Sequence, residues 1–94
     1  MSDITHFDYA VQRIASFLPS PTLRVLGGFV ALRRGHTCPR IVDVCIFLNL
    51  SEQTVRRHSI ELQRLGIISN GRFARTSEWA WLIRTNQSNQ EVIQ

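Results

Sequence analysis

The spacing of apolar residues changes at Gly66, and this change constrains the fold more than any other feature of the sequence. Before Gly66, apolar residues recur every three or four positions, which is the period of an amphipathic helix. After it they alternate with other residues, as Trp79, Trp81 and Ile83 do, and this pattern is typical of a half-buried strand. The sequence therefore predicts a mainly α fold that ends in a small antiparallel β-hairpin.

Four helices are expected before Gly66. Their ranges are Ile4–Leu18, Pro21–Arg34, Arg40–Leu48 and Ser51–Leu65. Ser20 and Ser51 are good start signals, because a serine side chain can accept a hydrogen bond from an unpaired backbone N–H at a helix start. The Gly27-Gly28 pair weakens the second helix by roughly 1 kcal/mol per glycine relative to alanine. We expect the compensation to be the close approach of a neighbouring helix.

The segment after Gly66 is expected to hold the strands and the turns between them. The predicted strands are Ile67-Ile68, Arg72–Arg75 and Trp79–Arg84. Asn70-Gly71 is a strong turn signal, and residues 76–78 offer a second connection. Both remain candidates for the tip of the hairpin. Residues 85–94 are polar and aperiodic, and we expect them to form a flexible tail.

Several classes of protein are disfavoured by the sequence. No apolar run approaches the roughly 20 residues that span a bilayer, and no signal-peptide pattern precedes the first helix, so a cytoplasmic location is expected. Cys38 and Cys45 are expected to be reduced thiols, and the three histidines (His6, His36, His58) do not stand at zinc-site spacings. There is no glycine-rich phosphate loop, nucleophile elbow or carboxylate pair. We therefore expect no enzyme, no metal and no cofactor.

The charge of the chain favours an anionic partner. The 94 residues carry a net charge of +4, and all eleven basic residues are arginines. The planar guanidinium suits bidentate contacts with phosphate oxygens and guanine edges. Between Arg56 and Arg84, six arginines face two glutamates, so most of the excess charge falls on the last predicted helix and the hairpin.

The stretch around the last helix carries the most specific pattern. It reads Leu48-Asn49-Leu50-Ser51-Glu52-Gln53-Thr54-Val55-Arg56-Arg57-His58 and continues to Gly66-Ile67-Ile68. This pattern resembles the helix-turn-helix of bacterial winged-helix repressors, most closely the DeoR type, with a similar core in the MarR type. The resemblance implies a winged helix over residues 20–84, preceded by an extra amphipathic helix in residues 1–19, in a bacterial, phage or plasmid-encoded protein. It also implies binding to double-stranded DNA, with residues 51–65 as the recognition helix in the major groove and the hairpin as a wing.

The same resemblance, with the polarity of the helix, suggests which residues contact DNA. Gln53, Thr54 and Arg57 are expected to contact bases, since Gln suits adenine and Arg suits guanine. The residues expected at phosphates or on the wing are Ser51, Arg56, His58, Arg72 and Arg75. An alternative for Arg56 and Arg57 is a solvated helix face paired with Glu52 and Glu61.

This chain also departs from the DeoR pattern. His58 and Ser59 stand where that family has Asp and Leu, and the long ligand-sensing domain of DeoR proteins is missing. Ile46, Phe47 and Ile60 leave more apolar surface than a small monomer needs. They keep open a winged helix used for protein contact. Within the DNA-binding class, a replication or partition protein of a plasmid or phage is the alternative to a transcriptional regulator, because the fold alone does not separate these roles.

The first helix has an apolar stripe that needs a partner. The stripe consists of Ile4, Phe7, Val11, Ile14 and Leu18. It can fold back on its own domain or pair with a second copy, and we expect a homodimer, because two joined modules gain specificity from paired half-sites.

Overall fold

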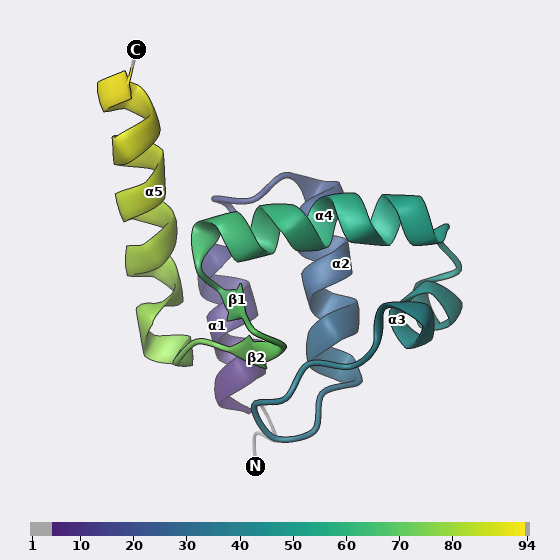
Figure 1. Cartoon of the computed structure of the whole chain (residues 1–94). Helices are drawn as coiled ribbons and strands as arrows, with labels where there is room; N and C mark the ends of the chain where they lie inside the picture. The colour runs from purple at the N-terminus through teal and green to yellow at the C-terminus, as the bar shows by residue number, and fades with distance from the viewer. Residues whose placement is uncertain (1–4, 94) are drawn as a thin grey trace.

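Five helices and one short hairpin make up the computed structural model, which describes residues 5–93 and their side chains as far as Asn86. The helices are α1 (His6–Ile14), α2 (Ser20–Ala31), α3 (Ile41–Leu48), α4 (Glu52–Leu65) and α5 (Trp79–Ile93). The hairpin strands are β1 (Ile68–Ser69) and β2 (Arg72–Phe73), and a 3-10 turn, η1 (Thr76–Glu78), leads into α5. In Figure 1, α4 lies across the ends of α1 and α2, with α3 on one side and α5 on the other. The protein is thus a compact, mainly α domain with a small antiparallel hairpin near the C-terminal helix.

The helix ends follow the capping chemistry of the sequence. Thr5 caps α1 through a reciprocal pair of bonds with Asp8: the Thr5 hydroxyl accepts from the Asp8 backbone, and the Asp8 carboxylate accepts from the Thr5 backbone. Gly66 ends α4 in the left-handed region, with φ at 88°. Ser20 makes no side-chain cap bond, since α2 begins one residue earlier than expected, after Pro19.

Helix α2 ends at Ala31, earlier than the predicted end at Arg34. The chain instead turns back at Gly35, which adopts φ of +58°, and the backbones of Arg34 and Thr37 exchange two hydrogen bonds of 3.1 and 2.8 Å. Residues 36–38 then run beside the hairpin. The Phe73 N–H donates to the His36 carbonyl, and the Cys38 N–H donates to the Gly71 carbonyl, both at 2.8 Å.

The buried core joins α1 and α5 to the three central helices. An aromatic cluster of Phe7, Phe73 and Trp79 links α1, β2 and the start of α5, with ring centroids 5.2 to 6.0 Å apart. The Trp79 indole N–H is satisfied by the Ala74 carbonyl at 3.1 Å. Aromatic packing of this kind fixes the hairpin between the first and last helices.

The stripe expected to mediate dimerisation is largely covered within the chain. Phe7, Ile14 and Leu18 are buried in the core, and Val11 is partly buried against it. Ile4 lies outside the described residues. Since α1 packs against α2 and α5, the fold-back alternative accounts for these side chains, and a dimer through them would have to open the core.

The strand predicted at Trp79–Arg84 is wrong, because this segment is the first half of α5. A strand would bury Trp79, Trp81 and Ile83 on one face. Instead Trp79 and Ile83 are buried, whereas Trp81 is 60% exposed. Residues four apart share a helix face and residues two apart do not, so the burial follows the helical period. The helix continues to Ile93 through the stretch expected to be a tail.

Close packing of α3 against α2 confirms the expectation for one of the two central glycines. A Cβ added to Gly28 would lie 2.7 Å from Leu48 Cδ1 and 3.2 Å from Val44 Cγ1. A Cβ added to Gly27 would meet nothing within 4 Å. Gly28 therefore lets α3 approach α2, and this contact sets the position of the segment that leads into α4.

Candidate nucleic-acid interface

A tight turn fixes the start of α4 against the end of α3. Asn49 adopts the left-handed conformation (φ 56°, ψ 50°) that ends α3, and the Leu50 N–H donates to the Cys45 carbonyl at 3.0 Å. Ser51 then caps α4, its hydroxyl accepting from the Thr54 N–H at 3.2 Å. Ser51 is exposed but acts here as a structural cap, which is compatible with a phosphate contact from the same turn.

One row of α4 is buried and holds the helix to the domain. Val55, Ser59 and Leu62 form this row, as the sequence predicts, and α4 packs against both α2 and α3. The Ser59 hydroxyl donates to the Arg56 carbonyl at 2.9 Å, so the buried polar group is satisfied inside its own helix.

The opposite row of α4 is exposed. Gln53, Arg57 and Ile60 stand at positions i, i+4 and i+7, so they form one stripe along the helix. We call these three residues the outer stripe. Ile60 is 64% exposed, and Arg57 makes no hydrogen bond or ion pair among the residues that the structure describes. The outer stripe thus offers an amide, a guanidinium and an apolar group to a partner.

The other arginines of α4 are ion-paired. Arg56 pairs with Glu52, its Nε donating to Oε1 at 2.8 Å, and Arg64 pairs with Glu61. The hydrogen bond from Arg64 lowers the pKa of Glu61. The solvated-pair alternative therefore describes Arg56, whereas Arg57 keeps an uncompensated charge.

Thr54 and His58 face the first turn of α2. The Thr54 hydroxyl accepts from the Ser51 hydroxyl at 2.8 Å, and Thr22 Oγ1 lies 3.0 Å from His58 Nδ1. Both residues are half-buried beside a hollow of about 270 Å³ that Arg24 also lines. His58 therefore joins α4 to α2, and Thr54 stands at the edge of the outer stripe.

Arg24 is a candidate that the sequence analysis missed. It is exposed near the start of α2, and its Nη2 donates to the Leu48 carbonyl at 3.0 Å, capping the end of α3. The sequence does place this arginine three residues after Pro21, in the first turns of the helix before the predicted helix-turn-helix. That position could have identified it. Its position beside Thr54 adds a cation next to the start of α4.

The tip of the hairpin is at Asn70-Gly71. Both residues have positive φ, 53° and 73°, as a two-residue hairpin turn requires, and Ser69 pairs with Arg72. The two predicted wing arginines separate here. Arg72 is exposed next to the tip, whereas Arg75 lies beyond β2, beside η1 and the N-terminal end of α1.

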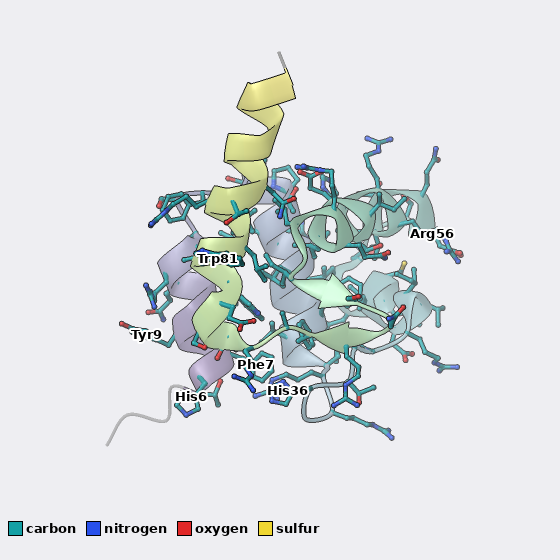
Figure 2. All side chains as sticks on the ribbon, turned by 60° about the vertical axis from the view of Figure 1, so that its left-hand side comes forward. His6, Phe7, Tyr9, His36, Arg56 and Trp81 are labelled. Atoms are coloured by element: carbon teal, nitrogen blue, oxygen red, sulfur yellow. The ribbon has the colours of Figure 1, made fainter. Side chains whose placement is uncertain are left out.

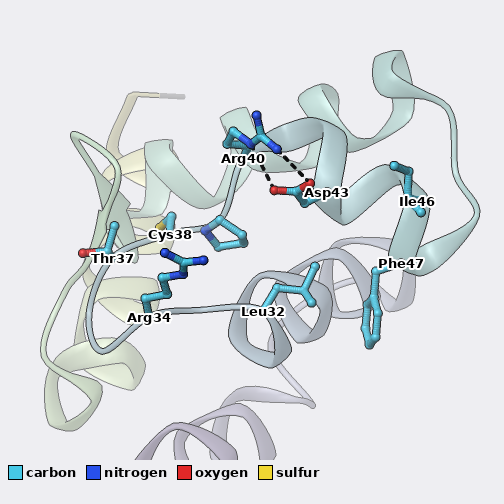
Figure 3. Close-up of a pocket in the computed structure, with 9 residues that line it drawn as sticks. Leu32, Arg34, Thr37, Cys38, Arg40, Asp43, Ile46 and Phe47 are labelled. Carbon is cyan, nitrogen blue, oxygen red and sulfur yellow. Dashed lines mark hydrogen bonds and ion pairs between the residues drawn. The ribbon is translucent and has the colours of Figure 1, made fainter.

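Two apolar residues of α3, Ile46 and Phe47, are exposed as expected. Ile46 is 75% exposed and Phe47 is 55% exposed. Figure 3 shows both beside an open hollow of about 740 Å³, with Leu32 near them and the Arg40–Asp43 ion pair on its rim. Cys38 also lines it, and burial raises the pKa of this thiol to about 11, so the thiol is protonated at neutral pH.

Other kinds of site receive no support from the described residues. They contain no group of His, Cys, Asp and Glu side chains that could hold a metal ion, and both cysteines are free. None of their helices is long and apolar enough to cross a bilayer. No protein-family model, curated protein or solved structure matches the chain.

Proposed function

We propose that the protein is a small winged-helix regulator that binds double-stranded DNA sequence-specifically, with α4 in the major groove. The observation that carries the proposal is the outer stripe, in which Gln53, Arg57 and Ile60 are exposed on a helix whose other face is buried. A helix that is fixed from behind and polar in front can present side chains to base edges.

The order of elements supports the winged-helix assignment. Helices α2, α3 and α4 are followed by the hairpin, and residues 36–38 form backbone hydrogen bonds with it. This is the order that the resemblance of residues 48–68 to bacterial winged-helix repressors implies. Helices α1 and α5 flank this unit and complete its core.

The chemistry of the outer stripe suits base recognition. Gln53 can form a bidentate pair with adenine, and Arg57 can form one with guanine. Ile60 can contact a thymine methyl group, which gives its exposure a role. Arg24 lies on α2, which packs against α4, and Arg72 stands next to the hairpin tip. We expect both to contact phosphates, since neither pairs with a carboxylate in the part of the chain that the structure describes.

Selection of bound duplexes from a random library tests the proposal. An enriched sequence bound with a steep salt dependence is expected, and an inverted repeat would support the homodimer. Arg57→Ala should weaken binding to the selected site by about 5- to 150-fold, because one bidentate pair contributes about 1–3 kcal/mol. Arg84→Ala, an exposed arginine on α5, is the matched control. Equal affinities of the wild type and Arg57→Ala would refute the proposal that α4 is the recognition helix.

Breaking the Glu52–Arg56 ion pair gives a second test, in which the affinity for DNA should increase. Glu52→Gln removes a carboxylate 2.6 Å from Arg56 and frees that guanidinium for a phosphate. We expect tighter binding and a salt slope steeper by about 0.9, the contribution of one neutralised phosphate. Glu78→Gln, on η1, removes the same charge away from α4 and should leave the slope unchanged.

Protein contact is the second candidate function. Ile46 and Phe47 are exposed beside the hollow in Figure 3, and Ile60 adds apolar surface on α4. Binding to DNA without sequence enrichment would favour a replication or partition role. If no duplex binds at low salt, the apolar surface of α3 becomes the preferred site for a protein partner.

A further inference from the structure

A third pocket lies at the N-terminal end of α1, away from the outer stripe. It is open, has a volume of about 510 Å³, and is formed by residues from three distant parts of the chain. Its lining comprises Thr5, His6, Phe7, Arg33, His36, Arg75, Thr76 and Ser77. Figure 2 shows His6, Phe7 and His36 gathered at this end of α1, with Arg56 of α4 at the other side of the molecule.

The polar side chains that line this pocket can all donate hydrogen bonds, and none of them is a carboxylate. Two arginines, two histidines and three hydroxyl groups line it, and the Thr5 hydroxyl already donates to the Asp8 carboxylate. Asp8, the acidic residue next to it on α1, is used in the cap with Thr5 and is not part of the lining. The electrostatic character of the pocket therefore favours an anion.

Arg33 gives the strongest indication of a missing partner. Its Nε is buried and has no hydrogen-bond acceptor among the described residues. Its guanidinium carbon lies 4.1 Å from the centroid of the Phe7 ring, and the ring of His36 lies 5.2 Å from the same centroid. A buried charged donor without an acceptor is rare in folded proteins. Arg33 as a whole is half-buried, and the Phe7 ring holds its guanidinium at the pocket. A small movement of this side chain would let a bound anion accept from the covered N–H.

We propose that this pocket binds the phosphate group of a small phosphorylated molecule. The guanidinium groups of Arg33 and Arg75 provide the charge and paired N–H donors that phosphate oxygens accept. The hydroxyls of Thr76 and Ser77 add neutral donors. The volume lies in the range of small-ligand sites, so there is room for an organic group beside the phosphate. This inference does not depend on DNA binding by α4.

Titration of the 94-residue chain with inorganic phosphate and with glycerol 3-phosphate tests the proposal. Nuclear magnetic resonance spectra should show saturable shifts of the His36 and Phe7 signals, and sodium chloride at equal ionic strength should not reproduce them. Arg75→Gln should weaken phosphate binding at least tenfold, because it removes one of the two guanidinium groups in the lining. Arg75 is exposed, so its loss leaves the core intact. Arg33→Gln should do the same if its melting curve shows a folded protein. Arg84→Gln, on α5, is the control and should bind like the wild type.

A phosphate can also come from a nucleic acid backbone, and the same variants separate the two sources. If the pocket serves a small molecule, Arg33→Gln lowers the affinity for glycerol 3-phosphate and leaves the affinity for duplex DNA unchanged, since Arg33 is no part of the proposed DNA interface. If Arg75→Gln weakens duplex binding and neither phosphate compound saturates, the small-molecule site is refuted in favour of a backbone contact. Shifts that persist in Arg75→Gln and Arg33→Gln, or that chloride reproduces, would refute a phosphate site altogether.

Discussion

The two central glycines of α2 provide a paired test of how the domain is packed. Gly27 and Gly28 are neighbours inside the same helix, so replacing either by alanine gives the same gain in helix propensity, about 1 kcal/mol. Only Gly28 faces α3. The difference in stability between Gly27→Ala and Gly28→Ala therefore isolates the steric cost of the α2–α3 contact.

The size of that cost follows from the distances. At Gly28 the added methyl group would lie 2.7 Å from Leu48 Cδ1 and 3.0 Å from Leu48 Cγ. Leu48 can move its terminal carbons by rotation, but Val44 Cγ1, at 3.2 Å, also limits the space. Overpacking of this kind costs about 1–3 kcal/mol. Gly28→Ala should consequently be less stable than Gly27→Ala by about 1–3 kcal/mol.

Thermal melts followed by circular dichroism measure the difference. Gly27→Ala should melt above the wild type, because the space around it is open. Gly28→Ala should melt at or below the wild type, and about 4–8 °C separates the two variants for each kcal/mol in a domain of this size. If Gly28→Ala raised the melting temperature as much as Gly27→Ala, α3 would not be held by close approach at this glycine.

Three further predictions concern the helix caps and a half-buried thiol. Ser51→Ala removes the α4 cap and should cost about 1 kcal/mol in urea denaturation. Ser20→Ala, without a side-chain cap bond, should cost less than about 0.5 kcal/mol; equal costs would contradict the cap. Asn86→Ala breaks hydrogen bonds of 3.0 and 2.9 Å to the carbonyls of Leu65 and Leu82, and should cost about 1–2 kcal/mol in the same assay. An unchanged free energy of unfolding would show that Asn86 does not hold α5 against the end of α4. Burial raises the pKa of Cys38 to about 11, so roughly one thiol in a thousand is ionised at pH 8. Its alkylation, followed by mass spectrometry, should accelerate about tenfold per pH unit; a rate at pH 8 equal to that of free cysteine would refute this.

Helices α2 to α4 were predictable because local signals and hydrophobic period agree there. Ser51, Asn49 and Gly66 each occupy a position whose backbone geometry favours that residue type. The periodicity of α4 also identified its buried row and, by subtraction, its exposed face. The tip of the hairpin could not be chosen from sequence, since two turn signals competed and only backbone pairing places it at Asn70-Gly71.

The last helix shows where a local pattern misleads. Trp79, Trp81 and Ile83 alternate over only five residues, and such a short run fits a strand or a helix equally well. Two signals favoured the helix: Trp79 and Ile83 are four apart, and no Gly or Pro interrupts residues 72–94. Tertiary packing decides the case, because a helix puts Trp79 against Phe7 and Phe73 and leaves Trp81 outside.

A count of charged residues on α4 does not show which charges are available to DNA. Helix α4 carries three arginines and two glutamates, but both glutamates are paired within the helix, so Arg57 supplies its exposed, uncompensated charge. The remaining cations come from other elements, Arg24 on α2 and Arg72 on β2. Each phosphate contact contributes a salt slope of only about −0.9. With only these three arginines at the proposed interface, a single copy would therefore bind weakly to random DNA, and its affinity for an operator would have to come from base contacts along the outer stripe or from a second copy.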